Sequence, residues 1–199
     1  MSTEEKTATK TAAQEAADRG KVSYAKRDYE NAIREFTEAI RLDNSVTVYF
    51  GRRGFVYSKI EDYDNAIKDY TDAIKLDPNN SDYLMYRGDS YYQKKDYYTA
   101  INDYTAAIKL DPLNTTPSRK RVDAYQKLRT KEGGQWMKLS LQERAALWAV
   151  MPDWERRERE REREEMMERV KVNVVLEGKE DKDTAIKDSM SIRDYSTWK

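Results

Sequence analysis

The chain of 199 residues contains no cysteine and no histidine. Without cysteine it can form no disulfide, thiolate nucleophile or iron–sulfur cluster, and without either residue it can form no Cys/His zinc site. Histidine is also the side chain that most often transfers protons near neutral pH. These absences argue against an enzyme, although chemistry based on carboxylates, lysine, tyrosine or serine stays open.

The sequence also lacks an excess of either charge and lacks a long apolar run. Lys plus Arg number 37 and Asp plus Glu number 37, so no global basic field attracts nucleic acid or an acidic membrane. The longest apolar run, Ala145–Met151, is far shorter than the roughly 20 residues of a membrane span. The beginning of the chain is polar and does not resemble a secretory signal. We therefore expect a soluble, cytoplasmic protein that has no membrane span and no nucleic-acid partner.

One phrase occurs three times, and each copy begins at the same interval after the previous one. The copies are Asp28–Asn44, Asp62–Pro78 and Asp96–Pro112, and the last two agree at most of their positions. The same interval separates three arginine–glycine pairs that precede the phrases: Arg19–Gly20, Arg53–Gly54 and Arg87–Gly88. Such regular recurrence predicts a repeat architecture.

The pattern within one copy predicts a pair of helices. Apolar residues of the second copy share one helical face, at positions i, i+1, i+4, i+7 and i+8: Ala66, Ile67, Tyr70, Ala73 and Ile74. Asp62 is the expected N-cap of this helix, and Pro78 ends it. Gly54 lies inside the preceding helix, where glycine costs about 0.5–1 kcal/mol relative to alanine. Its recurrence predicts a close helix contact, so each unit is a helical hairpin that also packs on its neighbour.

The repeat resembles the tetratricopeptide repeat (TPR). The second copy matches the family pattern at Phe50, Arg53, Gly54, Tyr57, Ala66, Tyr70, Ala73 and Pro78. The third copy matches it at Leu84, Arg87, Gly88, Tyr91, Ala100, Tyr104, Ala107 and Pro112. The first copy departs from the pattern with a small residue, a missing aromatic and a missing proline, at Ala16, Ser23 and Asn44. The resemblance implies an all-α, right-handed solenoid of three hairpins and a capping helix.

We divide the chain accordingly into seven segments. The three repeats are expected at residues 13–46, 47–80 and 81–114. They are followed by a capping helix and a helical extension, at residues 115–132 and 135–172. We expect a disordered N-terminus and a flexible tail, at residues 1–12 and 173–199.

In the family that the chain resembles, the first helices of successive repeats line a concave groove that binds an extended peptide or a helix. The matching positions here combine aromatic and charged side chains: Lys21, Tyr24, Arg52, Phe55, Lys59, Met85, Tyr86, Asp89, Tyr92, Arg119 and Lys120. Aromatic residues among cations suit a ligand with an apolar anchor and a carboxylate nearby.

One subtype of the family grips the acidic C-terminus of heat-shock chaperones with a two-carboxylate clamp. That clamp needs Lys and Asn in the first repeat, Asn in the second, and Lys and Arg in the third. The corresponding positions here are Ala17, Lys21, Arg52, Asp82 and Tyr86, and none of them matches. We therefore do not expect this chain to bind a chaperone tail by that chemistry.

The segment after the repeats differs in composition and carries all four tryptophans. Ser140 and Glu143 form a capping box at the start of an apolar helix. This helix either docks on the end of the repeats or meets a partner, through Trp136, Leu141, Trp148, Met151 and Trp154. Residues 153–169 alternate Glu and Arg, which predicts either a solvated charged helix or an arm along another protein. Val170–Leu176 weakly favours a strand, or else continues the helix.

Two functions follow from these features. The first is a non-catalytic adaptor or scaffold, without a cofactor, that binds a peptide or helix of another protein in the groove. The alternative is a structural or assembly subunit of a large complex, anchored by its C-terminal arm and tail. The sequence leaves open the partner, self-association, and whether the arm lies in the chain's own groove.

Overall fold

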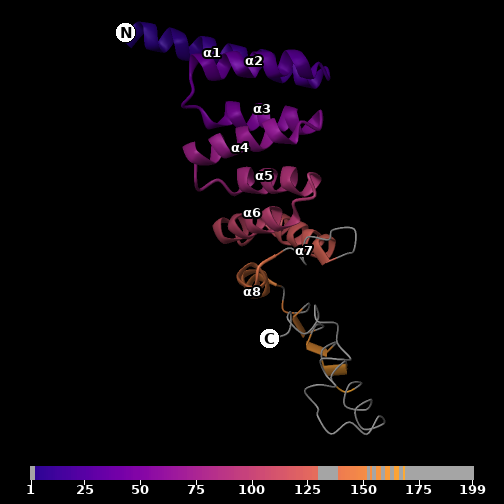
Figure 1. Ribbon diagram of the computed structural model, residues 1–199. Coiled ribbons are helices and arrows are strands. Elements are labelled where there is room, and N and C mark those ends of the chain that lie inside the picture. The colour runs from indigo at the N-terminus through magenta and orange to yellow at the C-terminus, as the bar shows by residue number, and fades with distance from the viewer. Residues whose placement is uncertain are drawn as a thin grey trace. The chain divides into compact units, whose positions relative to one another are not determined.

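The computed structural model describes residues 3–129 and 139–151, together with residues 153, 156, 157, 160, 161, 164, 165 and 168. Within these residues the chain is entirely helical, with no strand, as predicted (Figure 1). The helices are α1 (Thr3–Ala25), α2 (Tyr29–Leu42), α3 (Thr47–Lys59), α4 (Tyr63–Leu76), α5 (Ser81–Gln93), α6 (Tyr97–Leu110), α7 (Thr115–Arg129) and α8 (Leu141–Val150). The chain forms two compact units, Met1–Trp136 and Met137–Lys199, which we describe separately.

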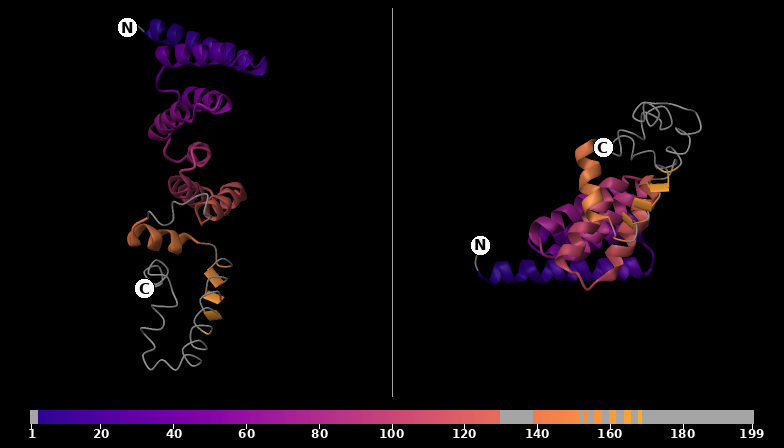
Figure 2. Two further views of the ribbon diagram at one scale, coloured as in Figure 1. Left: turned by 45° about the vertical axis from the view of Figure 1, so that its right-hand side comes forward. Right: turned by 90° about the horizontal axis from the view of Figure 1, so that it is seen from below.

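The first unit is a solenoid of successive antiparallel hairpins. Helices α1 and α2, α3 and α4, and α5 and α6 pack as pairs, and each pair packs on the next (Figures 1 and 2). Helix α7 packs on α6 at the end of this array. Helix α1 already begins at Thr3, so residues 3–12, which we expected to be disordered, are helical. Their content of Ala, Glu and Lys, which favour helix formation, gives the physical reason.

Each second helix of a hairpin begins at an aspartate N-cap. The side chains of Asp28, Asp62 and Asp96 each accept a 3.2 Å hydrogen bond from a backbone N–H three residues later. The prediction for Asp62 is therefore confirmed. The residue before each cap is in the left-handed region, with φ of 61° or 62°, although none of the three is glycine: Arg27, Glu61 and Lys95.

The interior of each hairpin combines alanine with one large ring. Phe36, Tyr70 and Tyr104 are each 1% exposed, and they face the recurring glycines of the first helices. A Cβ atom at Gly20 would lie 2.9 Å from the Phe36 ring, and one at Gly88 would lie 2.8 Å from the Tyr104 ring. The recurring glycines therefore serve close helix contact, as predicted.

A recurring arginine joins the second and the third hairpin to the one before it. In α3, Arg53 donates to both carboxylate oxygens of Asp69, at 2.8 and 2.7 Å, and also to Thr37 Oγ1 at 3.0 Å. Arg87 repeats this arrangement with Asp103 and Thr71. We call these two sets of contacts the arginine bridges. Since the carboxylate and the threonine belong to successive second helices, each bridge connects neighbouring hairpins.

The described part of the second unit contains α8. The Glu143 backbone N–H donates to Ser140 Oγ at 3.3 Å, and the Ser140 N–H donates to Glu143 Oε2 at 2.7 Å, which confirms the capping box. Leu147 and Met151, about one helical turn apart, are 1% and 2% exposed. None of the helices in the described ranges is both long and apolar enough to cross a membrane.

Candidate functional site

Three rings from three first helices lie next to one another on the first unit. Tyr24 of α1, Phe55 of α3 and Tyr86 of α5 are equally spaced in the sequence. The interval between them is shorter than one repeat by about one helical turn. The Tyr24 and Phe55 centroids are 5.6 Å apart, and the Phe55 and Tyr86 centroids are 6.5 Å apart. We call these three residues the aromatic row. Tyr29 extends it at one end and Tyr70 at the other, at 5.9 and 5.8 Å.

Two pockets adjoin the aromatic row, and Phe55 and Tyr86 line both of them. The tyrosine pocket has a volume of about 360 Å³ and is lined by Phe55, Ser58, Lys59, Tyr63, Tyr70, Tyr86, Asp89, Ser90, Tyr92, Gln93, Tyr104, Lys120 and Asp123. The valine pocket has a volume of about 420 Å³ and is lined by Lys21, Tyr24, Phe36, Val48, Gly51, Arg52, Phe55, Val56, Asn80, Asp82, Tyr83 and Tyr86. Each pocket has the size of a small-ligand or side-chain site.

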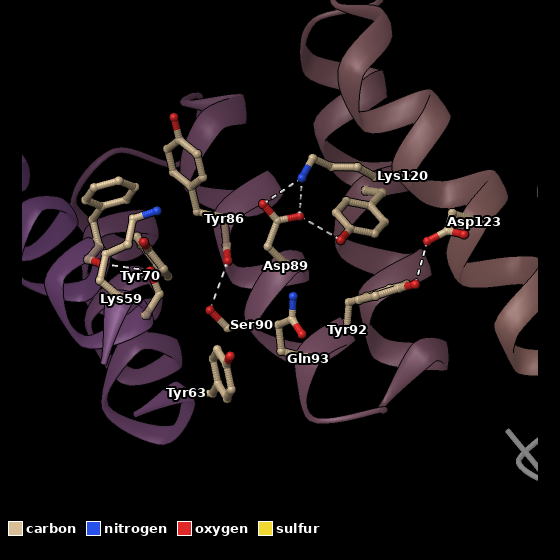
Figure 3. Close-up of a pocket in the computed structure, with 13 residues that line it drawn as sticks. Lys59, Tyr63, Tyr70, Tyr86, Asp89, Ser90, Tyr92, Gln93, Lys120 and Asp123 are labelled. Carbon is tan, nitrogen blue, oxygen red and sulfur yellow. Dashed lines mark hydrogen bonds and ion pairs between the residues drawn. The ribbon is translucent and has the colours of Figure 1, made fainter. Parts of the chain in front are cut away.

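Polar contacts between α5 and α7 form one end of the tyrosine pocket (Figure 3). Lys120 Nζ donates to both carboxylate oxygens of Asp89, at 2.8 and 2.9 Å. The Tyr104 hydroxyl donates to the same carboxylate at 2.8 Å, and the Tyr92 hydroxyl donates to Asp123 at 2.5 Å. Burial raises the pKa of both hydroxyls, so both remain protonated donors. The carboxylates of this pocket are therefore already hydrogen-bonded.

The two cations beside Phe55 differ from Lys120, which forms an ion pair with Asp89. Lys59 Nζ lies 4.9 Å above the Phe55 ring, and Arg52 is exposed about one turn earlier on the same helix. Among the residues that the structure describes, neither cation has an ion-pair partner. Lys21, by contrast, pairs with Asp18 at 2.5 Å. Asp82 is the only acidic residue among the described residues that line the valine pocket, and Asp89 and Asp123 line the tyrosine pocket, so basic and acidic side chains both lie around Phe55.

The structure brings together most of the residues expected in the groove. Nine of them line one or both pockets: Lys21, Tyr24, Arg52, Phe55, Lys59, Tyr86, Asp89, Tyr92 and Lys120. Arg119 is exposed on α7 and lines neither pocket. Met85 is only 8% exposed, so the structure places it in the interior instead of the groove. The reason is helix geometry, because neighbouring residues point about 100° apart and Tyr86 takes the groove-facing direction.

Several pocket residues were not expected from the sequence. Tyr83 lines the valine pocket because Gly51 leaves room for its ring, and a Cβ atom at Gly51 would collide with that ring. Val48, Tyr63 and Asp123 also line the pockets. Tyr83 follows Lys21 and Arg52 at the same sequence spacing that separates the rings of the aromatic row, and this spacing is the signal that could have found it.

The second predicted surface, in the extension, lies largely outside the described residues. Trp136 and Trp154 are not described, and the side chains of Leu141 and Trp148 in α8 are not described either. Met151 is buried, at 2% exposure. The binding role of this set therefore stays a prediction, as does the strand at residues 170–176.

Comparisons with known proteins agree with this geometry. Family models of the tetratricopeptide repeat match residues 48–80 and 81–114. Among solved structures, the second TPR domain of human RPAP3, in complex with an HSP70 peptide, is 26% identical, with a TM-score of 0.55 over 60% of this chain and 98% of that one. The TPR domain of Arabidopsis OM64 is 23% identical, with a TM-score of 0.57 over 59% and 98%.

The TPR2B domain of yeast Sti1, in a complex with pHsp70, is 25% identical, with a TM-score of 0.53 over 63% of this chain and 98% of that one. No curated protein sequence gives a significant match. The repeats, the recurring glycines and these matches agree: residues 48–114 match the tetratricopeptide repeat, and the first unit has the fold of a TPR solenoid.

Proposed function

We propose that this chain is a non-catalytic adaptor that holds a peptide or helix of a partner protein across the first helices of its repeats. The observation that carries the proposal is the aromatic row with a pocket on each side. Its three rings are only partly buried, so apolar surface remains in contact with water. Covering such surface yields about 25 cal/mol per Å².

Known TPR domains support the class of ligand. The RPAP3 and Sti1 domains named above were solved with chaperone peptides. We propose a different partner here, because the positions of the chaperone clamp are unsuited to a pair of carboxylates. Ala17 is 1% exposed, Asp82 is acidic, and Tyr86 belongs to the aromatic row.

The pocket carboxylates support a binding role instead of a catalytic one. Asp89 already accepts hydrogen bonds from Lys120 and Tyr104, and Asp123 accepts one from Tyr92. A general base needs an acceptor that is open to the substrate's proton. These groups instead stabilise the packing of α7 against α5, which keeps the pocket wall in place.

The test is partner capture from native lysate by the full chain, read by mass spectrometry. We expect the triple variant Phe55→Ala, Tyr86→Ala and Tyr92→Ala to lose partners that the wild type retains, because three side chains of the pocket walls are truncated. Its helicity, measured by circular dichroism, should stay near that of the wild type. The control variant truncates Leu76, Tyr98 and Leu113, which line neither pocket.

Unchanged partners in a folded triple variant would overturn the adaptor proposal. Binding would then lie elsewhere on the chain, and Trp148→Ala with Trp154→Ala in the full chain would test the extension. Loss of the same partners in that variant would favour the alternative of an assembly subunit held by its C-terminal arm.

A further inference from the structure

We propose that α7 carries a docking site for a segment of the same chain, residues 181–192, which binds there as the second helix of a fourth hairpin. In this arrangement Asp188 of the segment pairs with Arg121 of α7. The inference concerns the end of the repeat array, so it is independent of the groove and of the proposed function. It follows from three features: an incomplete arginine bridge, a fourth copy of a repeat phrase, and a complementary change in side-chain size.

Helix α7 has the sequence register of a first helix of the repeat. Its Arg121 lies one full repeat after Arg87 of α5. The phrase that forms the second helix of each earlier hairpin does not follow α7 in the sequence. In both arginine bridges the carboxylate lies 16 residues after the arginine, and the residue at that position after Arg121 is Met137. The usual position of the carboxylate is therefore occupied by a side chain that cannot pair with a guanidinium.

Arg121 forms only half of an arginine bridge. Its Nη1 lies 3.4 Å from Thr105 Oγ1, just as Nη1 of Arg87 contacts Thr71. In Arg87, the Nε and Nη2 atoms donate to Asp103. The Nε atom of Arg121 is buried without a hydrogen-bond partner, and no described carboxylate forms an ion pair with this residue. Burial lowers the pKa of Arg121, whereas the hydrogen bonds to Asp103 raise the pKa of Arg87. The guanidinium is thus oriented for a carboxylate that another segment has to supply.

The C-terminal tail contains a fourth copy of the phrase that begins each second helix. The three copies in the repeats are DYENAIRE, DYDNAIKD and DYYTAIND, beginning at Asp28, Asp62 and Asp96. The tail has DKDTAIKD at residues 181–188, which lie outside the described part of the chain. Each position of this copy except the second matches at least one of the other three. Its last residue, Asp188, has the place in the phrase that Asp69 and Asp103 have in the arginine bridges.

The phrase also contains the signal that starts a second helix. Asp96 accepts hydrogen bonds from the backbone N–H and the hydroxyl group of Thr99, at 3.2 and 2.8 Å. Asp181 and Thr184 are the same two residue types at the same spacing. Because aspartate is a preferred N-cap, the residues after Asp181 favour a helix that begins as the second helices of the repeats do.

Side-chain size changes in a complementary way on the two sides of the proposed contact. In the third hairpin, a Cβ atom at Gly88 would lie 2.8 Å from the Tyr104 ring, so a small residue faces a large one. These two residues directly follow the arginine and the aspartate of their bridge. The corresponding residues of the proposed fourth hairpin are Val122 and Ser189. A larger residue on the first helix therefore meets a smaller one on the second, and such an exchange of volume preserves packing.

The connection between α7 and the segment favours docking within one molecule. Residues 130–180 separate the two, whereas packed helices need to be only about 8–10 Å apart. A tethered segment is present at an effective concentration that does not depend on the protein concentration. The chain's own segment therefore has an advantage over the same phrase of a second copy.

The experiment is amide hydrogen exchange of the full chain, measured by mass spectrometry of its peptides. We expect residues 181–192 to exchange at least about tenfold more slowly than residues 173–180, because docking holds their backbone hydrogen bonds. Arg121→Glu should remove this protection, and Arg121→Glu with Asp188→Arg should restore it. The matched controls are Arg119→Glu, at an exposed site on α7, and Asp194→Arg, beyond the segment; both should keep the protection. Unchanged exchange of α3 to α6 shows that each variant is folded.

A second set of variants tests the contact without a change of charge. Ser189→Tyr places a large ring opposite Val122 and should release the segment. Val122→Gly with Ser189→Tyr recreates the pairing of the third hairpin and should restore slow exchange. Full protection in the Ser189→Tyr variant alone would contradict the proposed register.

The remaining outcomes also decide the question. If residues 181–192 of the wild type exchange as fast as residues 173–180, the inference is wrong. It is also wrong if Arg119→Glu removes the protection as completely as Arg121→Glu does. Protection that is lost when the protein is diluted about tenfold would mean that a second copy supplies the helix, which overturns docking within one chain.

Discussion

The arginine that precedes each recurring glycine occupies different surroundings in successive repeats. Arg53 and Asp69 are 16% and 2% exposed in their side chains, whereas Arg19 and Glu35 are 56% and 20% exposed. Burial raises the pKa of the Asp69 carboxyl group, while the hydrogen bonds from Arg53 act in the opposite direction. Asp69 therefore depends on its partner in a way that Glu35 does not.

We predict that Arg53→Ala lowers the free energy of unfolding by about 3–5 kcal/mol, because it leaves the Asp69 carboxylate buried without its cation. Arg19→Ala, the same change at the equivalent position one repeat earlier, should cost less than about 1 kcal/mol. Urea denaturation followed by circular dichroism measures both values. Equal losses in the two variants would show that the bridge contributes no more than an exposed ion pair.

At the scale of helices and turns, the hairpin corner is the most uniform strained feature of the first unit. Arg27, Glu61 and Lys95 have φ of 61° or 62°, in the region where glycine is favoured. The aspartate N-cap that follows each of them accepts a backbone hydrogen bond, which fixes the direction of the second helix. The corner thus keeps its geometry although each residue there carries a side chain.

We predict that Lys95→Gly stabilises the protein by about 0.5–1 kcal/mol, because removal of the Cβ atom relieves a left-handed conformation. Lys94→Gly is the control, since Lys94 has an ordinary φ of −71° and pairs with Asp64. The control should leave stability unchanged or lower it. Thermal unfolding distinguishes the two variants, and a lower melting temperature for Lys95→Gly would contradict the prediction.

Most of the helical architecture was predictable because it depends on local rules. The repeat period, the aspartate N-caps and the recurring glycines all follow from helix propensities and close packing within one hairpin. The arginine bridges and the aromatic row depend instead on contacts between hairpins. The rings of the row are fewer residues apart in the sequence than one full repeat, so the repeat period alone does not identify them. Met85 shows the same limit, because the choice between Met85 and Tyr86 as the groove-facing residue depends on how α5 is rotated.

At the scale of the whole molecule, several partly or fully buried phenol groups make the free energy of unfolding depend on pH in the alkaline range. Burial raises the pKa of Tyr70, Tyr92 and Tyr104 above the usual value of about 10. The folded chain therefore keeps phenolic protons that the unfolded chain has lost above that pH. Their contribution to stability is present in full below about pH 10 and decreases as the pH rises further.

We predict that urea unfolding at constant ionic strength shows a falling free energy of unfolding above about pH 10, together with delayed formation of phenolate absorbance in the folded protein. Tyr104→Phe removes one of these protons, so its stability should fall less steeply with pH, even though it loses a hydrogen bond to Asp89. Identical slopes for the wild type and this variant would contradict the argument.

The exposed position of Arg19 gives the array of hairpins a weak end. The pair that Arg19 makes with Glu35 is open to water, while the arginine bridges of the next two hairpins are largely buried. Amide hydrogens of α1 and α2 should therefore exchange with deuterium sooner than those of α3 to α6. Tyr24, the first ring of the aromatic row, belongs to this weak end. A ligand that covers the row should slow exchange most in α1, so that binding is detected as slower amide exchange in the terminal hairpin.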